Sequence, residues 1–105
     1  MGTWMTERRL SQTAARLRGL REELAMIDEQ LTQFADDADE LSLRALVSET
    51  PMASHESNEA RKHLDAMRKH RMHVVDEIAE LEQRQDQLLD RMTTGQGPKL
   101  TGDRE

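Results

Sequence analysis

Hydrophobic residues recur at every seventh position through the first half of the chain. One series is Leu10, Leu17, Leu24, Leu31, Ala38 and Ala45, and the second series in the same heptads is Thr13, Leu20, Ile27, Phe34, Leu41 and Ser48. A repeat kept in register over this length predicts one helix with a coiled-coil seam, the stripe that packs against another helix. Thr6 is a suitable N-cap. The pattern therefore predicts a helix over about 6–47.

The second half of the chain carries its own heptads. Its two seam series are Ala53, Ala60, Met67, Val74, Leu81 and Leu88, and Ser57, Leu64, Arg71, Ile78, Gln85 and Met92. Thr50 can cap a helix that has Pro51 at its first position, where the missing N–H is harmless. This predicts a turn over 48–50 and a second helix over about 51–92. A later start, capped by Ser54, is the alternative.

A short turn between two long helices predicts an all-α fold, namely a long antiparallel two-helix coiled-coil hairpin over 6–92. The expected seam pairs include Leu10 with Leu88, Leu17 with Leu81, Leu20 with Ile78, Leu24 with Val74, Leu31 with Met67 and Phe34 with Leu64. Residues 1–5 are expected to form a flexible leader, with Met5 as an alternative start. Residues 93–105 are expected to form a disordered tail, because Gly95 stops the helix and little apolar follows.

The flanks of the seam give a mixed charge pattern. The favourable facing pairs expected are Asp28 with Arg68, Asp37 with His63, and Arg44 with Glu56; the unfavourable ones are Glu23 with Glu77 and Arg16 with Arg84. Exposed ion pairs contribute at most about 1 kcal/mol. The flanking charges therefore neither support nor oppose the hairpin.

Several hydrophobic residues lie outside both seams, and four of them add apolar surface that a second hairpin could cover. These four are Met26, Leu43, Val75 and Leu89. A hairpin with one narrow seam buries little apolar surface, and small scaffolds of this kind commonly need oligomerisation. We therefore expect a homo-oligomer, with two hairpins pairing into a four-helix bundle.

The composition fits this fold. The chain has 105 residues, of which 35% are hydrophobic and 34% charged, with one Phe, one Trp and no Tyr, so bulky residues are too few for a globular core. A net charge of −6 argues against nucleic acid as a partner. There is no Cys, and no apolar run approaches the roughly 20 residues that cross a bilayer. A soluble, cytoplasmic protein without a membrane partner is the expectation.

The second predicted helix carries His63, His70 and His73, and the i, i+3 spacing of His70 and His73 could let these two share a metal ion. The basic residues of the run 61–73 lie among them and would repel a divalent cation, so we expect no metal site. The same run could bind phosphate or RNA, but we expect it to pair with acidic residues of 28–40 across the hairpin. No aromatic residue is present in the run to stack a base.

Arg71 and Gln85 are large polar residues at seam positions. Arg71 is expected opposite Ile27, and Gln85 opposite Thr13. Each could extend to the edge of a hairpin, or be buried in a larger bundle and fix its register.

No catalytic pattern is present. The chain has no Gly-rich phosphate loop and no Ser/His/Asp or Cys/His constellation, and a two-helix hairpin has no concave interior. We therefore expect no enzyme activity and no cofactor.

The residues around the predicted turn form the most apolar window of the chain. Leu43, Leu46, Val47 and Met52, with Glu49, are the candidate partner-binding residues, and we call them the turn patch. Apolar residues that point away from the seam at the end of a hairpin are typical of a contact surface. The alternative is a small cluster that closes the end of the hairpin.

In size the predicted hairpin resembles WXG100-type proteins, and in shape it resembles the hairpin of Gre-type transcription factors. The turn here reads Ser48-Glu49-Thr50-Pro51 rather than Trp-x-Gly, and it offers only Glu49 where the Gre-type turn is acidic. Both are analogies of shape, and no family is assigned. The sequence favours a non-catalytic protein–protein interaction module, an adaptor or regulator that docks on a larger protein, with the transcription apparatus as one class. The alternative is a self-assembling structural coiled coil without another partner.

Overall fold

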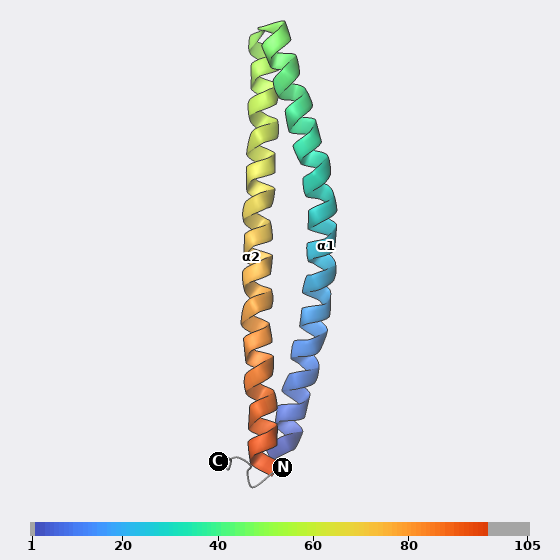
Figure 1. The fold of residues 1–105 in the computed structure, drawn as a ribbon, viewed down its shortest axis with the longest axis vertical. Coiled ribbons are helices and arrows are strands. Elements are labelled where there is room, and N and C mark those ends of the chain that lie inside the picture. Colours follow the sequence, from blue (N-terminus) through green and yellow to red (C-terminus); the bar gives the residue numbers. More distant parts are fainter. Residues whose placement is uncertain (1, 97–105) are drawn as a thin grey trace, which may run out of the picture. The chain divides into compact units, whose positions relative to one another are not determined.

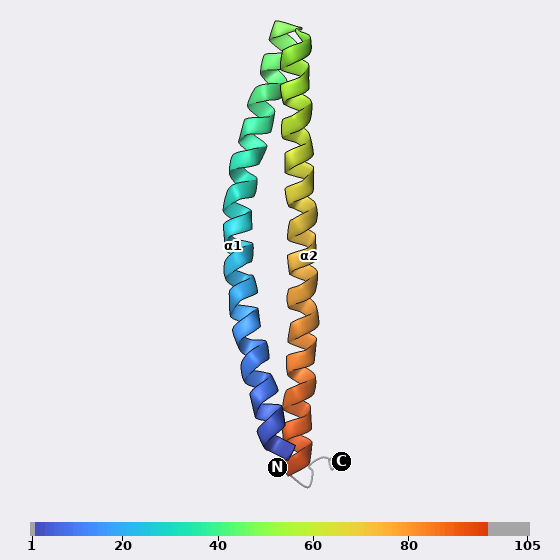
Figure 2. The same ribbon diagram turned by 180° about the vertical axis from the view of Figure 1, so that it is seen from behind.

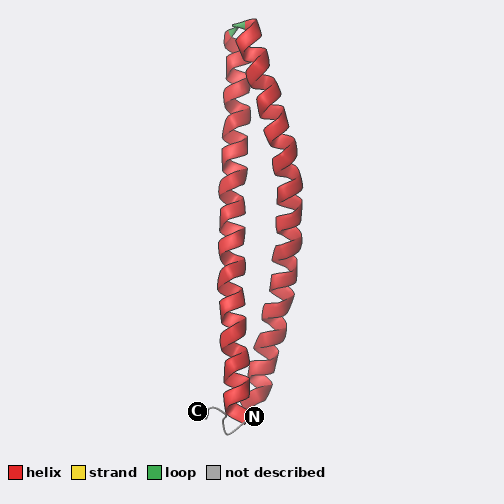
Figure 3. Ribbon diagram, in the orientation of Figure 1, coloured by secondary structure: helices red, strands yellow, loops and turns green. Residues whose placement is uncertain are grey.

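The computed structural model describes residues 2–96, which form two helices and no strand. Helix α1 spans Gly2–Ser48 and helix α2 spans Pro51–Gln96, with Glu49 and Thr50 between them (Figures 1 and 3). The two helices pack against each other as a hairpin. The predicted all-α helical hairpin is therefore confirmed.

The start of α1 differs from the prediction. The helix begins at Gly2 and not near Thr6, so the prediction of a flexible leader is wrong for residues 2–5. The physical reason is that the seam continues for one more heptad: Thr6 is buried, with only 6% of its surface exposed, and Thr3 is half-buried. Both positions are polar, which is why the repeat was not traced back to them.

The other boundaries lie close to those expected. Helix α2 begins at Pro51, the earlier of the two predicted starts, and continues to Gln96, past the predicted end near residue 92. Residues 93–96 of the predicted tail are thus helical. The rest of that tail, 97–105, lies outside the described residues.

The burial of side chains follows the heptads. Every seam position of the two helices is buried or half-buried except Ser48. The most buried large side chains are Leu17 and Leu20, each 1% exposed, followed by Ile27 at 3% and Val74 at 4%. The predicted seam is therefore the core of the fold.

The hairpin divides into two compact units, which we describe separately. The turn unit consists of residues 22–75 and contains the seam residues Ile27, Leu64 and Val74. The terminal unit contains, among the described residues, 2–21 and 76–96. Its core includes Leu17, Leu20 and Leu88.

The turn is held by three hydrogen bonds. Glu49 adopts a positive φ of 56°, and its N–H donates to the carbonyl oxygen of Ala45 at 3.0 Å, the hydrogen bond of a left-handed C-terminal cap. On the other side, the Thr50 hydroxyl accepts from the N–H of Ala53 at 3.1 Å, and the Ser54 N–H donates to the Thr50 carbonyl at 3.1 Å. Thr50 is therefore the N-cap of α2, as predicted.

Opposite charges face each other within each unit. In the turn unit, the α1 part (22–48) has eight acidic residues and one arginine, a net charge of −7, whereas the α2 part (51–75) has five basic and three acidic residues, a net charge of +2 with neutral histidines. In the terminal unit the signs are reversed: the α1 part (2–21) carries +4 and the α2 part (76–96) carries −4. Each unit thus joins a basic helical segment to an acidic one.

The individual ion pairs differ from those expected. Arg16 pairs with Glu77 at 2.9 Å instead of facing Arg84, and Arg21 pairs with Glu82 at 2.7 Å. The guanidinium of Arg16 contacts a carboxylate of α2, although the heptad spacing predicts an arginine opposite it. The Arg16 side chain is long enough to reach several residues of α2, and it pairs with one of opposite charge.

The turn unit shows the same selection. Glu23 contacts His70 at 3.2 Å, and Asp28 pairs with Arg71, not with Arg68. The expected partners Arg68 and Arg44 instead form pairs within their own helices, with Asp65 at 3.6 Å and Glu40 at 3.4 Å. The predicted facing charges were therefore wrong in detail, although the seam that they flank was right.

Candidate functional site

The apolar side chains of the turn patch are exposed to solvent. Leu43 is 64% exposed, Leu46 73%, Val47 84% and Met52 68%, and Glu49 is exposed between the two helices. Both ribbon views show α1 and α2 meeting at this end of the turn unit (Figures 1 and 2). The four side chains come from the last turns of α1 and the first turn of α2, so they lie within one short stretch of the surface.

Their exposure follows from the heptad. Near the turn, the seam contact is made by Leu41, Ala45 and Ala53, which are half-buried or buried. Small residues occupy two of these three positions. Leu46 and Val47 directly follow Ala45 and therefore point away from the opposite helix. Because they stay exposed, they do not form an internal cluster that closes the hairpin.

The turn holds this patch in a defined conformation. The cap hydrogen bond from Glu49 to Ala45 and the cap hydrogen bond from Ala53 to Thr50 leave two residues outside the helices. The carboxylate of Glu49 has no ion pair among the described residues. The turn patch is thus an exposed apolar surface with one free negative charge, positioned by regular helix ends.

Other hydrophobic residues outside the seam are exposed as well. Of those expected to contribute to a homodimer, Met26 is 60% exposed, Leu89 48% and Val75 36%. Met72, at 62%, belongs with them and was not singled out in the sequence. Met72 and Val75 lie one helical turn apart on α2, whereas Met26 and Leu89 lie elsewhere; the turn patch gathers four exposed apolar residues around the turn.

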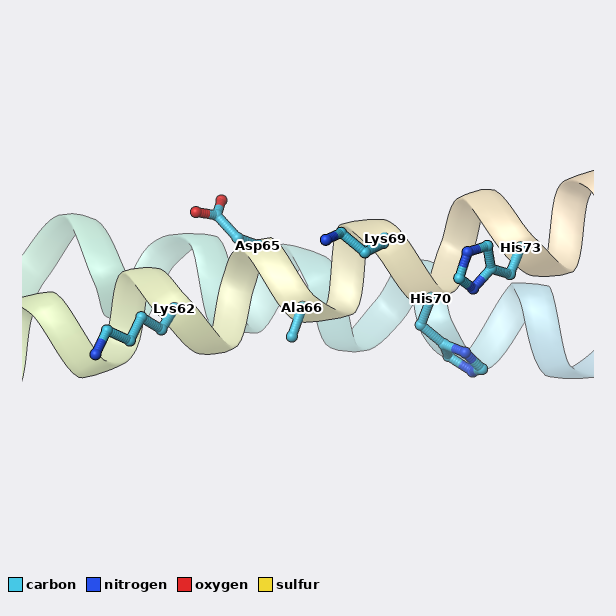
Figure 4. A pocket seen from close by; sticks show the side chains of 6 residues that line it. All are labelled: Lys62, Asp65, Ala66, Lys69, His70 and His73. Carbon is cyan, nitrogen blue, oxygen red and sulfur yellow. The ribbon is translucent and has the colours of Figure 1, made fainter.

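The histidines of α2 do not converge on one point. His70 and His73 line a hollow of about 440 Å³ with Lys62, Asp65, Ala66 and Lys69, and Figure 4 shows the His70 ring pointing away from Asp65. The His70 Nε2 atom contacts Glu23, and the His63 ring lies 6.4 Å from the ring of Phe34, centroid to centroid. Among residues 2–96, no group of three or more His, Cys, Asp or Glu residues is arranged to hold a metal ion.

The basic run of α2 is only partly neutralised from α1. Across the hairpin, Arg71 and His70 contact carboxylates, and Arg61 donates to the hydroxyl of Ser42 at 3.3 Å. Lys62 pairs within α2, with Glu59 at 3.4 Å. Within residues 2–96, no ion pair joins the acidic residues of 36–40 to this run. The expected cross-hairpin neutralisation therefore holds for two residues rather than for the whole run.

The large polar seam residues Arg71 and Gln85 are both half-buried. The Arg71 guanidinium extends to the edge of the seam and donates from Nε to Asp28 at 2.6 Å, and this hydrogen bond, with the negative charge of Asp28, raises the pKa of Arg71. Its position at the edge of the hairpin is the first of the two arrangements that the sequence left open.

No helix in the described part of the chain has the long apolar stretch that is needed to cross a membrane. Comparisons of the chain with protein-family models, with curated proteins and with solved structures gave no match. The functional argument therefore depends on the geometry described above.

Proposed function

We propose that this protein is a non-catalytic interaction module, a helical-hairpin adaptor or regulator whose turn patch docks on a larger protein. The observation that carries the proposal is the exposure of Leu43, Leu46, Val47 and Met52, four large apolar side chains that the fold does not use. Exposed apolar residues gathered on one surface are typical of contact sites. The shape analogy with Gre-type hairpins makes the transcription apparatus one class of partner.

The energetics favour binding over a structural role for these residues. Each of them gains little when the hairpin forms, because it remains more than half exposed. Each could contribute about 1.5–3 kcal/mol if a partner covered it. The regular caps on both sides of the turn reduce the ordering cost of binding, since the patch is already positioned.

The test is a pull-down from native lysate in which the bait is either the double variant L46S/V47S or the parent chain. We expect the variant to lose a stoichiometric partner that the parent retains, and its melting temperature to stay within a few degrees of the parent's. The matched control is M26S/M72S, which replaces two residues of similar exposure in the same unit, outside the turn patch. Partner capture that is retained by L46S/V47S, or lost equally in the control, would contradict the proposal.

A second function, self-assembly into a homodimeric four-helix bundle, is favoured by the exposed off-seam residues Met26, Met72, Val75 and Leu89. Sedimentation equilibrium over a concentration series tests it. If self-assembly is the function, the parent forms a dimer at micromolar concentration and M26S/M72S shifts to monomer. A parent chain that stays monomeric and folded at high micromolar concentration excludes this second function.

A further inference from the structure

A second surface feature lies in the terminal unit, far along the chain from the turn patch. A hollow of about 560 Å³ is lined by Arg9, Gln12 and Thr13 of α1 and by Arg84, Gln87, Leu88 and Arg91 of α2. Three arginines from two helices thus border one hollow, and no carboxylate lines it. Such a concentration of like charge raises the local positive potential and favours the binding of an anion.

These three arginines differ from others in the same unit. Arg16 and Arg21 each pair with a glutamate of the opposite helix. Arg9, Arg84 and Arg91 form no ion pair within residues 2–96. Two glutamates of this part of α2, Glu77 and Glu82, are thus paired with other arginines, and no ion pair within residues 2–96 reaches the arginines around the hollow.

A buried hydroxyl lies at the same place. Thr13 lines the hollow, is only 7% exposed, and has no hydrogen-bond partner among the described residues. Buried hydroxyl groups are nearly always hydrogen-bonded, and one without a protein partner needs a ligand or water. The side-chain amides of Gln12 and Gln87 add further donors to the lining.

From this arrangement we infer that the hollow binds a small, multiply charged phosphate anion. Guanidinium groups match phosphate oxygens with two parallel hydrogen bonds each, and three of them balance an anion that carries several negative charges. The volume is within the range of small-molecule sites. No aromatic side chain lines the hollow to stack a nucleobase, so the recognised group is the phosphate itself.

The experiment is isothermal titration calorimetry of the full chain with inorganic pyrophosphate at constant ionic strength, compared with potassium chloride. We expect saturable binding with one site per chain. The variant R84Q should weaken it by about tenfold or more, because a charge-assisted contact is lost. The matched control R18Q removes the same charge from an exposed position in the same unit that does not line the hollow.

A second measurement reads the site directly. In NMR spectra, pyrophosphate should shift the amide resonances of Thr13 and Gln87 in the parent chain and in R18Q, but not in R84Q. Circular dichroism should show that all three chains are equally helical. R84Q without ligand should be at least as stable as the parent, because one of three repelling charges is gone. Equal weakening in R18Q and R84Q, or a chloride response equal to that of pyrophosphate, would mean general charge screening and would overturn the inference.

Discussion

Nε of Arg71 donates to Oδ1 of Asp28 across the hairpin at 2.6 Å, from a heptad position that holds Leu64 and Ile78 in the two neighbouring heptads. The ion pair lies at the edge of the seam, with both side chains more than 40% exposed. Exposed pairs of this kind contribute at most about 1 kcal/mol. The arginine therefore occupies a core position without supplying the stability that a hydrophobic residue would give there.

This relationship predicts that R71L stabilises the fold. Leucine at the seam would bury apolar surface opposite Ile27 and should raise the free energy of unfolding by about 1 kcal/mol, whereas D28N should lower it by less than about 1 kcal/mol. Urea denaturation followed by circular dichroism gives both values. A loss of more than 1 kcal/mol in R71L would show that Arg71 fixes the register of the hairpin instead.

The cost of replacing a seam leucine by alanine should depend on how deeply that leucine is buried. Leu17 and Leu20 are 1% exposed, whereas Leu24 and Leu31 are half-buried. Leu→Ala should therefore cost about 3–5 kcal/mol at Leu17 or Leu20 and about 2 kcal/mol at Leu24 or Leu31. Equilibrium unfolding of the four single variants checks this order. Equal losses at all four positions would contradict the burial pattern.

Gly19 offers a stabilising substitution. It lies in the interior of α1 on the exposed side, and an added Cβ would meet no atom within 4 Å. Gly19→Ala should therefore raise the free energy of unfolding by about 1 kcal/mol, since alanine loses less backbone entropy in a helix. Thermal melting measures the effect. A lower melting temperature would mean that a second copy or a partner packs closely against this position.

The turn provides a further prediction. Glu49 is the one residue other than glycine with a positive φ in the described chain, at a position where glycine is usual. E49G should stabilise the hairpin by about 0.5–1 kcal/mol, because the Cβ clash of the left-handed conformation is removed. E49A is the control: it removes the same charge but keeps the Cβ, and it should give no gain. If both variants change stability equally, the carboxylate and not the backbone conformation is responsible.

The sequence was sufficient for the seam because each core position is set by the residue spacing. Leu20 and Val74 lie where the heptads put them, and the cap at Thr50 fixes where α2 starts. The heptad pattern gives a weak signal where its members are polar, as at Thr3 and Thr6. The predicted start of α1 is therefore later than the start in the structure. The exposure of Leu46 and Val47 could be predicted for the same reason as the core, since an off-seam residue points outward.

The charged surface could not be predicted in this way. The long Arg16 side chain can reach several residues of α2, and in the structure it pairs with Glu77. The spacing of residues in the heptad does not determine which of them it contacts. The hollow bordered by Arg9 and Arg84 could not be predicted from the sequence for a related reason. Arg9 and Arg84 are about 75 positions apart, and the heptad pattern gives no signal for the arginines beside the seam.

The distribution of charge along each helix determines the direction in which two such helices can associate. Both α1 and α2 have a basic N-terminal half and an acidic C-terminal half, and neither has an acidic residue in its first turn or a basic residue in its last. This order of charges is the reverse of the one that the helix dipole favours, so the charges destabilise the ends of each helix when it is alone. Side by side in parallel, the two helices would place arginine near lysine and carboxylate near carboxylate along their whole length. Seams of leucine and alanine fit either direction, but these charges make the antiparallel one preferred, and high salt should weaken that preference.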